Sequence, residues 1–174
     1  PRSAQAHSGM GIAWVAKRQY AKAIEDFDAA IRLDSKLAKA WAGRAEAHRL
    51  LEHLKEAVAD STTAIVLDPM LARAFRTRGE SYLAGGQTEG ALSDVNKAIA
   101  LDPKYAAAYF ARGDIHRKLR NADQAIADYS KGIEFDSSSP RPLYVRADLY
   151  RKVGKPELAI ADYSRVIDMD AKKP

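Results

Sequence analysis

The sequence predicts an all-α fold in which pairs of antiparallel helices stack into a solenoid. Aspartates recur every 34 residues along the chain, and each stands near the end of a similar segment, such as AIVLDP and AIALDP. These aspartates are Asp34, Asp68, Asp102, Asp136 and Asp170. Aliphatic residues recur with helical spacing before them, and glycine or proline interrupts the chain in between. A fixed period of this length is the signature of a repeat architecture.

The composition agrees with closely packed helices. Apolar residues make up 47% of the 174 residues, and aromatic residues only 8%. No apolar run approaches the roughly 20 residues that cross a membrane, so we expect a soluble segment, cytoplasmic or periplasmic. The chain has no cysteine, which excludes disulfides, thiolate nucleophiles and Cys-based zinc sites. The net charge of +5 is spread along the chain, which indicates a solvated surface rather than a nucleic-acid footprint.

Counted from Ala4, five units of equal length cover positions 4–173 as one predicted domain without an insertion. The units are 4–37, 38–71, 72–105, 106–139 and 140–173. Each unit reads as two helices of about 12 to 14 residues, an ordinary length for a globular protein. Breakers such as GGQ at 85–87 and GKP at 154–156 separate the two helices. A single pair cannot bury its apolar face alone, so the pairs are expected to stack.

Each predicted helix has its own packing signal. The first helix of every unit carries a small residue that lets the second helix approach: Gly11, Ala45, Gly79, Gly113 and Ala147. The second helices carry aliphatic residues spaced by seven, such as Ile24 with Ile31 and Val58 with Ile65. This spacing places both members on one stripe, where they can contact the next unit.

The period and these positions resemble the tetratricopeptide repeat, whose pattern is W-x2-L-G-x2-Y, then A-x3-F, then P, over about 34 residues. The third unit shows the resemblance at five positions: Phe75, Gly79, Tyr82, Ala91 and Pro103. The end units depart from the pattern, with His7 in place of the first large residue and Val166 and Ala171 at the last two positions. The resemblance implies a right-handed superhelix with the first helices on its concave side. It also implies a non-catalytic scaffold for protein–protein interactions.

Two charged columns run through the repeats. One consists of arginines: Arg44, Arg78, Arg112 and Arg146. The other consists of aspartates: Asp26, Asp60, Asp94, Asp128 and Asp162. Because identical residues in every unit cannot distinguish a ligand, we interpret both columns as structural. The hypothesis is that each aspartate pairs with the arginine in the first helix of the following unit, as Asp94 would with Arg112. This register leaves Asp162 unpaired at the end.

No catalytic, metal or cofactor site is expected. His48 and His116 occupy positions that hold Tyr or Trp in other units, so packing explains them better than metal ligation. His48 and His53 are five residues apart, which does not place them on one helical face. The AGGQTEG segment at 84–90 lacks the lysine of a phosphate loop, and no nucleophile stands with a base. RNA-reading helical arrays use varied polar pairs that these columns lack, so we expect no nucleic-acid partner.

The resemblance places ligands against the first helices. Pairing at i,i+3 or i,i+4 is expected for Glu46–Arg49, Arg76–Glu80, Asp114–Arg117 and Asp148–Arg151. This leaves surplus cations: Lys39, Arg73, Lys118, Arg141 and Lys152. Only Arg73 suits the two-carboxylate clamp of chaperone-tail binders, so that specificity is rejected.

The predicted groove contacts are Lys39, Arg73, Arg76, Phe110, Arg141 and Tyr144. Phe110 and Tyr144 are aromatic at a position that is usually polar, and exposed aromatics beside arginine are typical of binding hot spots. Either these rings face a peptide with an acidic and an apolar element, or they cover each other or touch a neighbouring chain. In the first case Phe110→Ala should weaken partner capture and leave the melting temperature nearly unchanged.

The alternative prediction is an assembly or spacer module without a dedicated peptide ligand. Ile160 and Ile167 in the last predicted helix are as apolar as their counterparts inside the array, although no further repeat follows them in this sequence. Such a face marks an interface or a missing element. The start PRSAQAH and the end DAKKP suggest a piece of a longer protein, and self-association through the C-terminal face is the expected mode of assembly.

Overall fold

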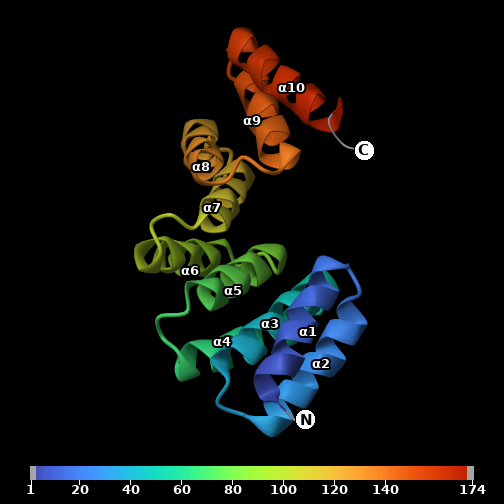
Figure 1. The fold of residues 1–174 in the computed structure, drawn as a ribbon. Helices are drawn as coiled ribbons and strands as arrows, with labels where there is room; N and C mark the ends of the chain where they lie inside the picture. Colours follow the sequence, from blue (N-terminus) through green and yellow to red (C-terminus); the bar gives the residue numbers. More distant parts are fainter. Residues whose placement is uncertain (1–2, 172–174) are drawn as a thin grey trace. The chain divides into compact units, whose positions relative to one another are not determined.

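The structure is a computed structural model that describes residues 3–171, and these residues form ten α-helices and no strand (Figure 1). The helices are α1 (Ala4–Ala16), α2 (Tyr20–Leu33), α3 (Ala38–Leu50), α4 (Leu54–Leu67), α5 (Ala72–Ala84), α6 (Thr88–Leu101), α7 (Ala106–Lys118), α8 (Ala122–Phe135), α9 (Pro140–Lys152) and α10 (Pro156–Ala171). Each predicted 34-residue repeat therefore holds two helices, and the predicted helix lengths are confirmed except for α10, which is longer. Residues 172 and 173, which end the fifth predicted unit, lie outside the described residues.

The chain divides into two compact units, each larger than a single 34-residue repeat. The first unit is Pro1–Leu101 and contains α1 to α6, and the second unit is Asp102–Pro174 and contains α7 to α10. In the first unit α1 packs on α2, α3 on α4 and α5 on α6, and α2–α3 and α4–α5 join the pairs. In the second unit α7 packs on α8 and α9 on α10, and α8–α9 joins the pairs. Stacked helix pairs within each unit confirm the predicted all-α architecture.

The repeated aspartate closes the turn that follows α2, α4, α6 and α8, whereas Asp170 lies inside α10. Its carboxylate accepts a hydrogen bond from the backbone N–H two residues later, at 3.0 Å for Asp34 and Lys36 and at 2.9 Å for Asp136 and Ser138. Asp68 and Asp102 make the same contact. This is the Asx-turn geometry that favours Asp at the start of a turn. The hydrogen bonds from Ser138 also lower the pKa of Asp136.

The turn inside each pair uses one left-handed residue. Positive φ angles occur at the same position of all five repeats: Arg18, Glu52, Gly86, Arg120 and Gly154. Glycine adopts this conformation without strain, whereas a residue with a side chain carries a cost of about 1 kcal/mol. The GG and GK breakers seen in the sequence are therefore the two unstrained versions of a turn that all five pairs share.

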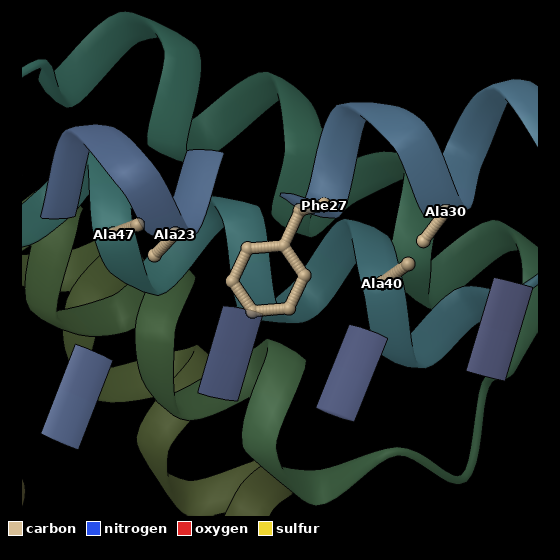
Figure 2. Close-up of a cluster of buried hydrophobic side chains, with 5 residues drawn as sticks. All are labelled: Ala23, Phe27, Ala30, Ala40 and Ala47. Carbon is tan, nitrogen blue, oxygen red and sulfur yellow. The ribbon is translucent and has the colours of Figure 1, made fainter. Parts of the chain in front are cut away.

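In the first unit, one buried cluster of the core is built around a single ring (Figure 2). Phe27 of α2 is fully buried, and it lies among Ala23, Ala30, Ala40 and Ala47. A Cβ atom added to Gly11 would come within 2.7 Å of the Phe27 ring, and one added to Gly43 would also collide with it. Small residues on α1 and α3 therefore let a single aromatic ring fill the space between three helices.

The charged columns pair in a different register from the hypothesis. Arg44 and Arg146 each bond the aspartate in the second helix of their own repeat, at 2.7 Å to Asp60 and to Asp162 respectively. Arg78–Asp94 and Arg112–Asp128 follow the same rule. The prediction that each aspartate pairs with the next repeat, leaving Asp162 unpaired, is wrong. The physical reason is that this aspartate faces the first helix of its own pair.

A different column of the second helices reaches the next repeat. Arg44 Nη1 also donates to Asp28 at 2.5 Å, and Arg146 Nη1 donates to the Ser130 hydroxyl at 2.8 Å. Each of these arginines therefore clamps its own pair with one side of the guanidinium and the preceding helix with the other. In the first repeat, where Met10 replaces the arginine, Asp26 instead accepts hydrogen bonds from the His7 and Trp14 rings.

Candidate binding groove

A cavity of about 230 Å³ lies beside the first helices of the second unit, and we call it the groove cavity. It is lined by Ala107, Phe110, Asp114, Tyr129, Asp136, Ser139, Arg141, Pro142 and Val145. These residues come from α7, α8 and α9 and from the segment between α8 and α9. Two predicted groove residues, Phe110 and Arg141, therefore meet at one site, together with the Tyr129 ring, which the sequence did not single out.

Phe110 forms one wall of the groove cavity. Its ring stacks on Tyr129, with centroids 6.3 Å apart and planes at 26°, and a Cβ atom on Gly132 would collide with it. It also packs against the buried cluster that contains Leu149. The expectation that Phe110→Ala leaves the melting temperature nearly unchanged does not fit this packing, because the deletion opens a hole beside Gly132.

Tyr144 is 57% exposed and packs edge-on against Tyr163 of α10, with ring centroids 5.5 Å apart. Each predicted groove aromatic thus leans on a tyrosine in the second helix of its own repeat. The ring partner of Phe110 is therefore Tyr129 and that of Tyr144 is Tyr163, which does not support the alternative that Phe110 and Tyr144 cover each other.

The polar edge of the groove cavity centres on Asp114. Its carboxylate accepts hydrogen bonds from the Tyr129 hydroxyl at 2.7 Å and from Arg117 at 3.0 Å, and it lies 3.5 Å from Arg141. Burial and the negative charge of Asp114 raise the pKa of Tyr129, which keeps the hydroxyl protonated as a donor. The predicted Asp114–Arg117 pair is confirmed. Arg141 has a partner, contrary to the prediction of a surplus charge.

The other predicted ion pairs on the first helices are also present. Asp148 bonds Arg151, as expected, but it also bonds Lys152 at 2.6 Å, so Lys152 is not surplus either. Both partners lower the pKa of Asp148. The pairs Glu46–Arg49 and Arg76–Glu80 are confirmed in the first unit.

On α3 and α5 of the first unit, the same helix faces carry a buried ionic cluster. Arg76 is only 7% exposed, and it bonds Glu80 and, at 3.1 Å, Glu46. Arg49 bridges both carboxylates, and the Thr77 hydroxyl donates to Glu46 at 3.1 Å. Burial alone would raise the pKa of Glu46, but the charge of Arg76 and the hydrogen bond from Arg49 outweigh it and lower that pKa.

Three predicted contacts of the first unit therefore differ in access. Arg76 is committed to the ionic cluster, whereas Lys39 on α3 is exposed. Arg73 is half-buried, and its charge also lowers the pKa of Glu46.

The histidines support packing. The His48 and His53 rings lie 5.7 Å apart, because the chain reverses between the end of α3 and His53, the residue before α4. Burial lowers the pKa of His48, which keeps the ring neutral. Within residues 3–171, no group of three or more candidate metal ligands comes together.

Comparison with known proteins gives a consistent result. Sequence models of the tetratricopeptide repeat match residues 8–69 and 76–140, and another such model matches residues 140–173. No curated protein sequence matches the chain. Among residues 3–171, no helix is both long and apolar enough to cross a bilayer.

Solved structures show the same fold at low identity. TTC0263, a thermophilic TPR protein of Thermus thermophilus, has a TM-score of 0.87 at 22% identity, covering 98% of this chain and 93% of that one. PilF of Pseudomonas aeruginosa has a TM-score of 0.83 at 19% identity, covering 95% and 76% respectively. YrrB, described as a TPR protein with an unusual peptide-binding site, has a TM-score of 0.63 at 20% identity, covering 98% and 88%.

Proposed function

Because this chain belongs to the tetratricopeptide repeat family, whose members generally serve as non-catalytic scaffolds that bind proteins, we propose that it binds a peptide segment of a partner protein at the groove cavity. The observation that carries the proposal is the combination, at one site, of two stacked aromatic rings, an aliphatic wall and an exposed arginine. YrrB, whose description names a peptide-binding site, offers a precedent for this kind of ligand.

The size of the groove cavity fits one side chain of a peptide. Its volume of about 230 Å³ is below the roughly 300–1,000 Å³ of small-molecule sites. Phe110, Tyr129 and Val145 supply apolar walls, which suit an aliphatic or aromatic anchor. An anchor buried in such a pocket supplies a large share of the binding energy.

The rim favours a carboxylate next to that anchor. Arg141 is 73% exposed and lies 3.5 Å from Asp114 Oδ2, while Tyr129 and Arg117 both donate to Oδ1 of the same carboxylate. Arg141 can therefore turn toward a ligand without leaving Asp114 unsatisfied. In the second unit Tyr144 is a further proposed contact. In the first unit Lys39 and Arg73 are proposed contacts of its own groove face, and Arg76 is outside the contact set because it is buried.

The test is selection of a displayed random-peptide library on the intact chain, followed by calorimetry with the selected peptides. Ala107→Leu should fill the groove cavity from α7 and weaken binding roughly tenfold or more. Arg141→Glu should weaken peptides with an acidic residue and reduce the salt dependence of their binding.

Two matched variants control for folding and charge. Ala127→Leu makes the same change at an exposed position of α8, and Lys155→Glu makes the same charge change in the α9–α10 turn. Both should bind like the unmodified chain. If the selected peptides bind Ala107→Leu with unchanged affinity, the anchor site is wrong. If no library peptide binds saturably, the proposed function is wrong.

A further inference from the structure

The first helix exposes a face that the equivalent helices bury. In α3 this face consists of Ala40, Gly43 and Ala47, and all three are buried where α2 packs on α3. The equivalent residues of α5, at the α4–α5 contact, are also buried: Ala74, Thr77 and Ser81. In α1 the same positions hold Ala6, Gly9 and Ala13, and all three are exposed. A Cβ atom on Gly9 would meet nothing within 4 Å.

The last helix exposes the opposite half of the same contact. Ile24 and Ile31 of α2 are half-buried against the cluster that holds Ala40 and Ala47. Their counterparts in α10, Ile160 and Ile167, are 64% and 68% exposed. Within residues 3–171, α10 therefore carries a pair of aliphatic side chains with no helix beneath it, and α1 carries a small-residue face with no helix above it.

The two faces also match in shape. A hollow of about 240 Å³ on α1, lined by Met10, Ala13, Trp14 and Lys17, lies where the start of an antiparallel second helix would pack. In the α2–α3 contact, Ile24 near the start of α2 takes this place relative to Ala47 near the end of α3. The equivalent residue of α10 is Ile160. Aliphatic side chains seven apart and a face of Ala and Gly interdigitate as a ridge in a groove.

The polar bridge between repeats would lack its arginine at this contact. Inside the array, an arginine on the first helix donates to a polar residue of the preceding second helix, as Arg44 does to Asp28 and Arg146 to Ser130. At the two exposed faces these positions hold Met10 and Ser164. Because Met10 stands in place of the arginine, a contact between the faces would bury no unpaired guanidinium at this position.

We propose that α10 of one copy of this chain docks on α1 of a second copy, in the way that α2 docks on α3. This inference is independent of peptide binding in the groove cavity. The contact is heterologous, since two different faces meet, so each copy keeps one face free for a further copy. One helix face is small for a protein interface, and the association should be weak at low concentration.

The test is a complementation experiment with the intact chain, followed by analytical ultracentrifugation up to millimolar concentration. Ile160→Arg blocks the face of α10, and Ala13→Arg blocks the face of α1. Both positions are exposed, so circular dichroism and melting should be unchanged. Each variant alone should stay monomeric, with association at least roughly tenfold weaker than in the unmodified chain. An equimolar mixture should form a 1:1 dimer through the two intact faces.

A matched control is Val66→Arg, which makes a similar change at a 75% exposed aliphatic residue of α4 and should associate like the unmodified chain. Three results would overturn the proposal. The unmodified chain could remain monomeric at millimolar concentration. Either blocked variant could still self-associate, which would indicate a symmetric contact between like faces. The mixture could fail to form the 1:1 dimer.

Discussion

The two units use the same helix face in different ways. On α3 and α5, the groove side holds the buried cluster of Glu46, Arg49, Arg76 and Glu80, which links the two helices. On α7 and α9, the positions equivalent to Arg76 hold Phe110 and Tyr144, and a cavity opens beside Phe110. The repeated Arg–Asp bonds occur in both units. The repeated scaffold bonds are therefore the same in both units, whereas this helix face varies and holds an ionic cluster in one unit and a cavity in the other.

The largest expected effect tests the cohesive side of the comparison. Glu46→Gln removes one of the two carboxylates that Arg49 and Arg76 share, so that Glu80 alone faces both arginines. Breaking a buried charge cluster in this way should lower the free energy of unfolding by about 3 kcal/mol. Asp114→Asn in the second unit should cost only about 1 kcal/mol, because that carboxylate is less buried. Urea unfolding followed by circular dichroism measures both, and equal losses would contradict the distinction between the units.

A medium effect tests the packing around the groove cavity. Gly132→Ala places a methyl group against the Phe110 ring and should destabilise the protein by about 2 kcal/mol. The loss of stability should be smaller in a Phe110→Leu background, because the two changes act on one contact. Additive losses in the double variant would show that Phe110 does not pack on Gly132.

Gly9→Ala in α1 meets no neighbouring atom, so it should instead stabilise the protein by up to about 1 kcal/mol at a concentration where the chain is monomeric.

The smallest expected effect is the pH dependence of the ionic cluster. The pKa of Glu46 lies below its ordinary value of 4.5 in the folded state, so its stabilisation is complete above that value and is lost as the pH falls below it. Between pH 5 and pH 3, the unmodified chain should therefore lose about 1 kcal/mol more than Glu46→Gln does. Thermal melts of both proteins across this interval measure the difference, and parallel curves would argue against a paired Glu46.

The period predicted the helices well because one local interaction recurs with it. The Asx turn of Asp34 and its equivalents needs only two consecutive residues beyond the aspartate, so the sequence pattern contains it fully. The register of the charged columns could not be read in the same way. Asp94 has a first-helix arginine on either side of it in the sequence, Arg78 before and Arg112 after. Only the rotation of each helix in the packed pair selects between them, and it selects Arg78.

The candidate site shows the same limit. The i,i+4 pairing of Arg76 with Glu80 was predictable, because both lie on one helix. The contact of Arg76 with Glu46 depends on how α3 and α5 pack, and both side chains are buried where the two helices meet. Tyr129 was missed because it occupies a core position of the family pattern. The sequence did contain a signal for Tyr129: it follows Phe110 by 19 residues, as Tyr163 follows Tyr144, and both pairs of rings are in contact.

The Arg–Asp bond within each repeat also affects how the protein unfolds. Arg146 and Asp162 close only a short loop of the chain, so the α9–α10 pair carries its own clamp and does not depend on a distant segment for it. Arrays with such local contacts are described by the stability of each unit and of its neighbouring interfaces. A pair at one end can therefore open while the others stay folded. Amide hydrogen exchange should be fastest in the end pairs and should slow stepwise toward the middle of the array, rather than being uniform along the chain.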